Sequence, residues 1–169
     1  MKDLMIGWGT ADITPQGRVA LMGQFETRIT DEVYAPLRAV ALAIAAPGQA
    51  PVYWVGCDLL FTPVSLTDAA AERLTGRIPG FAREQLVLSA THIHTGPFPE
   101  REGESSLLRY RVTEPGVTPP EAAIARAADG IAAAVIQARE AMEPSFVQTA
   151  ASRIRTGYCR RAVYTDGTA

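Results

Sequence analysis

Residues 86–97 have the sequence LVLSATHIHTGP, and this stretch predicts how the surrounding chain is organised. Its first three residues form a short apolar run typical of a buried strand, and Gly96-Pro97 ends the segment. His92 and His94 are the only two histidines in the 169-residue sequence. Residues two apart on an extended backbone point to the same face, so we expect two imidazoles side by side at a strand end.

Paired imidazoles indicate a site for a divalent metal, because neutral imidazole is a common zinc ligand. A His-x-His motif is short, and the alternative is one hydrogen-bonded histidine and one exposed histidine without a ligand. A catalytic zinc also needs about three protein ligands and an open position, which two histidines do not complete.

Composition predicts a folded globular protein. The chain is 47% hydrophobic with a net charge of −2, and its length suffices for one domain with a sizeable core. It contains no basic run expected of a nucleic-acid partner and no apolar run of the roughly 20 residues that span a membrane. The N-terminus lacks the apolar region of a secretory signal, so we expect a cytoplasmic protein, or a secreted one whose leader has been removed. Cys57 and Cys159 are expected to be reduced, partly buried thiols.

Three apolar segments predict the first strands of a central sheet. Residues 4–10 predict one strand, followed by a turn in which Asp12 and Thr14 bond to nearby backbone. Residues 37–46 and 52–61 are nearly continuous apolar runs, which predicts strands that are buried on both faces. Their short connection, rich in proline and glycine, predicts an antiparallel hairpin.

A helix is predicted from residue 62 to 75, with Pro63 at its first position, and the histidine strand follows it. This strand–helix–strand order predicts two parallel strands, and ligands gather beyond the carboxyl ends of such strands. Asp58 stands at the end of one strand and His92 at the end of the other. A carboxylate there is costly unless it is paired, so Asp58 is a candidate catalytic residue or a support for a metal ligand.

The second half of the chain predicts a loop, a helix and a strand. Residues 98–116 are polar and are predicted to form a lid or binding loop. Thr118 and Glu121 suggest a capping box. The helix that follows carries one apolar stripe: Ile124, Ala128, Ile131, Val135, Ala138 and Met142. Residues 145–156 alternate loosely and predict another strand. We therefore expect an α/β fold with a mixed central β-sheet and flanking helices, in which residues 1–169 form a single, partial catalytic domain.

Four segments together resemble the N-terminal part of the neutral/alkaline (non-lysosomal) ceramidases. They are GWGTADITP at residues 7–15, Met22-Gly23, Asp58-Leu59 and SATHIHTGP at residues 89–97. The family's histidine pattern is Thr-His-Thr-His-Ser-Gly-Pro, and Ile93 and Thr95 replace its Thr and Ser. The resemblance covers essentially the whole chain, but only the first portion of the family's catalytic domain.

The resemblance implies a zinc amidohydrolase that cleaves the N-acyl bond of ceramide, giving a sphingoid base and a fatty acid. It implies that His92 is the Zn²⁺ ligand and that His94 faces the substrate and stabilises the tetrahedral intermediate. Gly23 and Arg160 would bind substrate. Arg160 lies in a Cys-Arg-Arg segment that departs from the family's Asn-Arg-Arg pattern, and its alternative role is solvated surface charge. The family's other zinc ligands have no counterpart here, so we expect a truncated member with little or no hydrolysis alone.

Two other interpretations remain open. One is a non-catalytic binding or structural domain that keeps the fold without the full metal set. The other is an unrelated metallohydrolase of the amidohydrolase type, although its His-x-His normally lies on the first barrel strand. A Ser-His-Asp site is disfavoured because Ser89 lies only three residues from His92 at one strand end. The substrate would be an N-acyl lipid or another amide, and the sequence does not indicate the oligomeric state.

Overall fold

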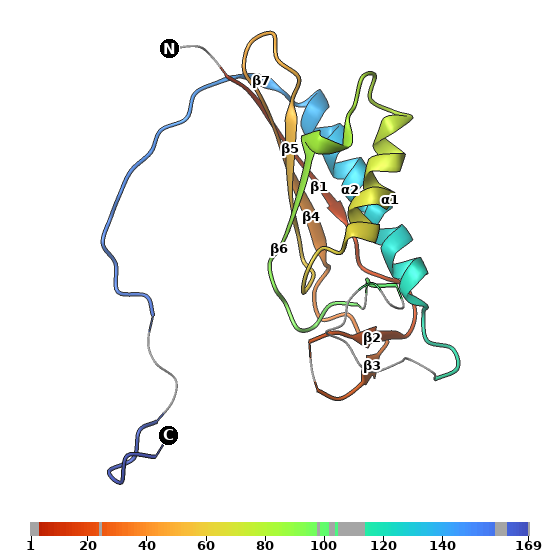
Figure 1. Cartoon of the computed structure of the whole chain (residues 1–169), viewed down its shortest axis with the longest axis vertical. Coiled ribbons are helices and arrows are strands. Elements are labelled where there is room, and N and C mark those ends of the chain that lie inside the picture. The colour runs from red at the N-terminus through yellow and green to blue at the C-terminus, as the bar shows by residue number, and fades with distance from the viewer. Residues whose placement is uncertain are drawn as a thin grey trace.

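The computed structural model describes residues 4–23, 25–97, 99–101, 104, 114–157 and 162–168. Its central feature is a five-stranded sheet with the strand order β6-β5-β4-β1-β7 (Figure 1). These strands are β1 (Leu4–Asp12), β4 (Arg38–Ala45), β5 (Val52–Cys57), β6 (Leu86–Ala90) and β7 (Glu143–Ser145). β2 (Val19–Leu21) and β3 (Arg28–Thr30) form a separate two-stranded sheet.

The sheet is mixed, as the sequence predicts. β4 and β5 pair as an antiparallel hairpin, and β1 adds to β4 in the antiparallel direction. β5 and β6 are parallel. The chain crosses between them through α1 (Val64–Thr75) and the short 3₁₀ helix η1 (Arg83–Gln85). The predicted α/β fold with a mixed central sheet and flanking helices is therefore confirmed.

One face of the sheet is covered and the other is open. Figure 1 shows α1 and α2 (Pro120–Glu140) on the same side of the sheet. The prediction that the strands at 37–46 and 52–61 are buried on both faces is wrong, because exposure alternates along β4 and β5. Cross-strand partners on the open face include Trp8, Leu42, Trp54 and Val87, one from each of four adjacent strands. Trp8 is 61% exposed and Trp54 is 56% exposed.

Two glycines let α2 lie directly against β1. A Cβ atom added to Gly7 would stand 2.0 Å from the Ala138 carbonyl oxygen, and one added to Gly9 would stand 2.1 Å from the Ala134 carbonyl oxygen. Both contacts are with helix backbone, which cannot move aside as a flexible side chain would. The absence of a side chain at Gly7 and Gly9 therefore sets the distance between α2 and the sheet.

The apolar stripe of α2 is confirmed as core. The five stripe residues inside the helix are buried, and Met142, just past its end, packs against the core. The predicted capping box at Thr118 is wrong. Pro119 is the N-cap, and the Thr118 hydroxyl instead donates to the Gln16 carbonyl oxygen at 3.0 Å. This bond ties the start of α2 to the segment before β2.

The start of α1 is held by a carboxylate from outside the helix. Pro63, predicted as the first helical residue, is the N-cap, so the helix begins one residue later, at Val64. Glu104 accepts hydrogen bonds from the Ser65 amide at 2.6 Å and from the Ser65 hydroxyl at 2.5 Å. Desolvation opposes the charge, but these hydrogen bonds outweigh it, so the pKa of Glu104 lies below its usual value. A negative charge at this position also complements the helix dipole.

The predicted strand at residues 145–156 is wrong. Only β7 forms there, pairing with residues 4–6 of β1, and residues 146–157 are exposed and outside any strand. An alternating pattern gives a segment two unlike faces, but a strand also needs a partner edge. In the described part of the chain, no helix combines the length and apolar character required to cross a membrane.

Candidate functional site

The two predicted site positions at the carboxyl ends of β5 and β6 lie side by side. We call residues 91–97 the histidine loop. The Thr91 amide donates to the Cys57 carbonyl oxygen at 2.9 Å, and the His92 amide donates to the Leu59 carbonyl oxygen at 3.0 Å. The histidine loop therefore continues along the segment that follows β5, beyond the end of the regular strands.

The His92 ring is anchored through one nitrogen. Its Nδ1 lies 2.9 Å from the Leu60 carbonyl oxygen. A carbonyl oxygen only accepts hydrogen bonds, so Nδ1 carries the proton in the neutral ring and Nε2 keeps a free lone pair. Carbonyl anchoring of this kind fixes the tautomer and orientation of metal-binding histidines.

The backbone of His92 differs from the sequence prediction. Its φ is +63°, in the left-handed region, so the loop is not extended at this position. Such backbone is uncommon for residues other than glycine, and it clusters at functional sites. The imidazoles are adjacent as predicted, but a turn in the backbone brings them together instead of a strand.

His94 is anchored in the same way. Its Nδ1 lies 2.6 Å from the Gly23 carbonyl oxygen, which again leaves Nε2 with a free lone pair. The ring centroids of His92 and His94 are 5.1 Å apart, with the ring planes at 81°. Both residues are exposed. Gly23 has φ +95°, and a Cβ there would stand 2.5 Å from His94 Nδ1, so this anchor requires glycine.

Asp58 connects the two strand ends. Its Oδ2 accepts a hydrogen bond from the Arg38 amide at 3.0 Å, and its Oδ1 accepts one from the Thr91 hydroxyl at 3.1 Å. The carboxylate therefore holds the residue directly before His92. Burial, together with the negative charge of Asp58, raises the pKa of the neighbouring Cys57 thiol to about 12.

The small β2–β3 sheet supports the far end of the histidine loop. The Met22 amide donates to the Gly96 carbonyl oxygen at 3.1 Å, and Leu21 forms an antiparallel bridge with Pro97. In Figure 1 this sheet lies beyond the end of the main sheet at which β6 finishes. The loop is thus fixed by Asp58 at its start and by β2 at its end.

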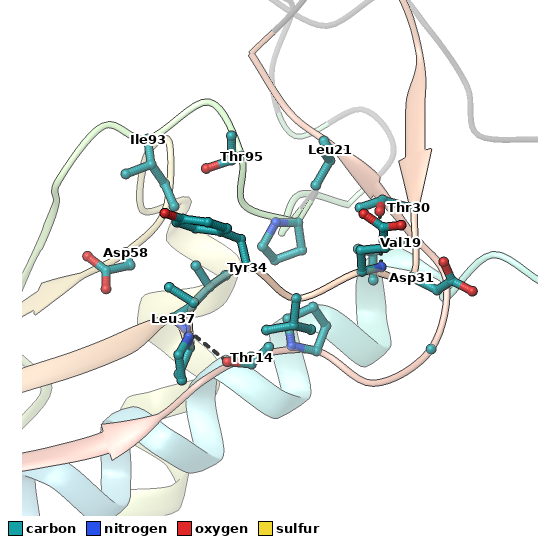
Figure 2. A pocket seen from close by; sticks show the side chains of 17 residues that line it. Thr14, Val19, Leu21, Thr30, Asp31, Tyr34, Leu37, Asp58, Ile93 and Thr95 are labelled. Carbon is teal, nitrogen blue, oxygen red and sulfur yellow. Dashed lines mark hydrogen bonds between the residues drawn. The ribbon is translucent and has the colours of Figure 1, made fainter.

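A cavity of about 890 Å³ lies beside the histidine loop. Ile93 and Thr95 line it, whereas His92 and His94 are not among its lining residues. Figure 2 shows Tyr34 reaching into the space between these two loop residues and Leu37. Tyr34 is itself exposed, so the cavity is open to solvent. Its volume falls in the range of small-molecule sites.

The structure brings together four of the five predicted site residues. Gly23, His92 and His94 lie around the histidine loop, and Asp58 holds its first residue. Arg160 lies outside the described residues. Nowhere in the described ranges do three histidine, cysteine, aspartate or glutamate side chains form a group able to hold a metal.

Sequence reasoning missed two groups that hold His92 and His94 in place. One is the Leu60 carbonyl, and no side-chain pattern identifies a backbone acceptor. The other is Arg28, whose Nη2 donates to the His94 carbonyl oxygen at 2.6 Å. These two residues are 66 positions apart, and no spacing or charge pattern in the sequence links them. The alternating Arg28-Ile29-Thr30 was the one available signal for β3.

Fold and site together define an α/β protein with a paired-histidine loop at the carboxyl edge of its sheet. Among solved structures, the neutral ceramidase from Pseudomonas aeruginosa has a similar fold, with a TM-score of 0.68 and 24% identity. A ceramidase complexed with C2 is also similar, with a TM-score of 0.66 and 23% identity. Each alignment covers 85% of this chain and 22% of the other chain, so this chain spans about a fifth of their length.

These similarities show a ceramidase-like fold. No protein-family model matches the chain, and no curated protein matches it in sequence.

Proposed function

We propose that this chain provides the histidine-loop portion of a zinc-dependent hydrolase that cleaves the N-acyl amide bond of a ceramide-like lipid. One observation carries the proposal. Both imidazoles are anchored through Nδ1 by backbone carbonyl oxygens, so each keeps a free Nε2 at an exposed position beside the other. The ceramidase-like fold supports the choice of an amide as substrate.

The donor set fits zinc in part. His92 has the features expected of a zinc ligand. Its Nε2 keeps a free lone pair, the residue is exposed, and the other ring nitrogen, Nδ1, is held by the Leu60 carbonyl oxygen. A catalytic zinc needs about three protein ligands, and the described residues hold no such group. The remaining ligands in this proposal belong to polypeptide outside the described residues. When bound, zinc would polarise the amide carbonyl and lower the pKa of water toward ~7.

The geometry of His94 defines which proton it can move. With Nδ1 donating to Gly23, the neutral ring can only accept a proton at Nε2. His94 would therefore act first as a base. Once protonated, it would donate from Nε2 to the oxyanion or to the leaving amine. The order, base first and acid second, follows from the hydrogen bond between His94 Nδ1 and the Gly23 carbonyl oxygen. It makes the predicted role of His94 as an oxyanion stabiliser more specific.

Asp58 acts through the loop in this proposal. Both of its carboxylate oxygens already accept hydrogen bonds, from Arg38 and from Thr91. It would fix the residue that precedes the zinc ligand, and a direct catalytic role for Asp58 remains a prediction. Gly23 would contribute its carbonyl oxygen to His94, and the substrate-binding roles of Gly23 and Arg160 also remain predictions.

Zinc titration by calorimetry tests the proposal. We expect the wild-type chain to bind Zn²⁺ only weakly, because the described residues hold no complete ligand set, and the His92→Ala variant to lose that weak binding. The His94→Ala variant is the matched control, because it removes an imidazole from the same loop and leaves His92 anchored to Leu60. Zinc binding that survives in His92→Ala, or that is absent from the wild type, would contradict the assignment of His92.

A second function is favoured by a different observation. The lack of a three-ligand group among the described residues is what a non-catalytic binding or structural domain would show. Hydrolysis of a fluorescent ceramide in the presence of Zn²⁺ separates the two candidates. We expect little turnover by the chain alone. Turnover that depends on both histidines would support the hydrolase, and zinc binding at neither histidine would support the non-catalytic domain.

A further inference from the structure

Two groups of the β2–β3 sheet hold opposite ends of one residue. Gly23, two residues after β2, accepts from the His94 ring at 2.6 Å. Arg28, the first residue of β3, donates from Nη2 to the His94 backbone carbonyl oxygen, also at 2.6 Å. The ring and the main chain of His94 are therefore both tied to this hairpin.

We propose that Arg28 is a positioning residue for His94. Arg28 sets the tautomer and the direction of the His94 imidazole without touching substrate. This inference rests on the proposed function only in the role it gives to His94. A hydrogen bond from a guanidinium is charge-assisted and stronger than one between neutral groups. The Arg28 hydrogen bond fixes the position of the His94 backbone. A fixed backbone keeps the His94 Nδ1 atom within hydrogen-bond distance of the Gly23 carbonyl oxygen.

The surroundings of Arg28 favour this role over that of a surface charge. Arg28 is half-buried, and its Nε is buried without a hydrogen-bond partner in the described ranges. Within those ranges, no carboxylate lies at salt-bridge distance from it. Its one described hydrogen bond is the one to His94. A half-buried guanidinium whose described contact is a single loop carbonyl is placed to hold that loop.

Register explains how the hairpin reaches His94 twice. Leu21 and Arg28 are cross-strand partners in the two-stranded sheet, and Leu21 also bridges to Pro97 of the histidine loop. The same strand pair thus carries a backbone bridge, the Gly23 carbonyl and the Arg28 side chain. Displacing the Arg28 side chain alone should release His94 and leave the backbone bridge at Pro97 in place.

Nitrogen-15 NMR of the imidazoles tests this directly, because the chain contains only two histidines. In the Arg28→Gln variant, we expect the ratio of Nδ1–H to Nε2–H tautomer at His94 to fall by roughly fivefold or more. His92, which is anchored to Leu60 instead, should keep its signals. Arg28→Lys, which keeps a cationic donor, should recover part of the wild-type ratio.

Arg18→Gln is the matched control. Arg18 also reaches a backbone carbonyl, but it is that of Pro115, at 3.5 Å, which does not belong to the histidine loop. We expect no change at either histidine in this variant. Unchanged His94 signals in Arg28→Gln, or equal changes at both histidines, would overturn the proposal. The readout needs neither zinc nor substrate, so a failure of the zinc titration would refute the proposed function and leave the positioning role standing.

Discussion

Replacement of Gly9 by alanine tests how α2 is seated on the sheet. The new Cβ would stand 2.1 Å from the Ala134 carbonyl oxygen and 2.6 Å from the Ala138 nitrogen, both in the backbone of α2. Ordinary van der Waals contact begins at 3.4 Å, so the helix would have to retreat by more than 1 Å. Overpacking of this kind lowers the free energy of unfolding by about 2–4 kcal/mol. For a chain of this size, the loss corresponds to a fall in Tm of roughly 5–15 °C.

Gly56→Ala is the matched control for this experiment. Gly56 also lies in a strand of the main sheet, but a Cβ there would meet nothing within 4 Å. We expect this variant to be neutral, or stabilised by about 0.5 kcal/mol through the unfolded state. Urea denaturation followed by circular dichroism measures both variants. Equal stability of Gly9→Ala and Gly56→Ala would refute the close seating of α2.

Three further outcomes follow from the same structure. In a Cys159→Ser background, Cys57 should not react with a thiol reagent at pH 8, because burial raises its pKa to about 12; rapid labelling of the folded chain would contradict this. Acrylamide should quench the fluorescence of both Trp8 and Trp54, since both are more than half exposed, and protection of either would mean that the open sheet face is covered. Asp58→Ala should lower the free energy of unfolding by about 0.5–1.5 kcal/mol, because it removes the hydrogen bonds to the Arg38 amide and the Thr91 hydroxyl, whereas an unchanged unfolding midpoint would show that these bonds do not stabilise the fold.

The sheet topology could be predicted because its signals are local. The short connection at residues 47–51 leaves little choice other than a hairpin, and a helix between two strands makes them parallel. This was enough to bring Asp58 and His92 to the same edge of the sheet. The resemblance to ceramidases rested on four short segments, and the structural similarity supports it at the level of the fold.

Burial on the second sheet face could not be predicted from the same runs. Val40, Leu42 and Trp54 have the composition of a covered face, yet they lie on the open side of the sheet. Apolar composition shows that a strand face can be buried, but whether that face is buried depends on which elements pack against it. The strand predicted at residues 145–156 failed for a related reason, since a suitable pattern does not provide a partner edge.

The geometry of the site depends on backbone conformations and backbone contacts that no sequence pattern predicts. A left-handed φ at His92 is uncommon for a residue other than glycine, so the extended backbone assumed there was the ordinary expectation. The Leu60 carbonyl and Arg28 reach the loop from distant segments. The pattern at residues 86–97 predicts two histidines at a strand end, but it does not predict the groups that anchor them.

The tautomers of the two wild-type imidazoles test the central claim most directly. Long-range proton–nitrogen NMR on the folded chain distinguishes Nδ1–H from Nε2–H in each neutral ring. We expect both His92 and His94 to carry the proton on Nδ1, because each Nδ1 faces a backbone carbonyl oxygen. Both Nε2 atoms would then be free to bind a metal or to accept a proton. An Nε2–H tautomer at either ring would contradict the anchored pair on which the proposed function depends.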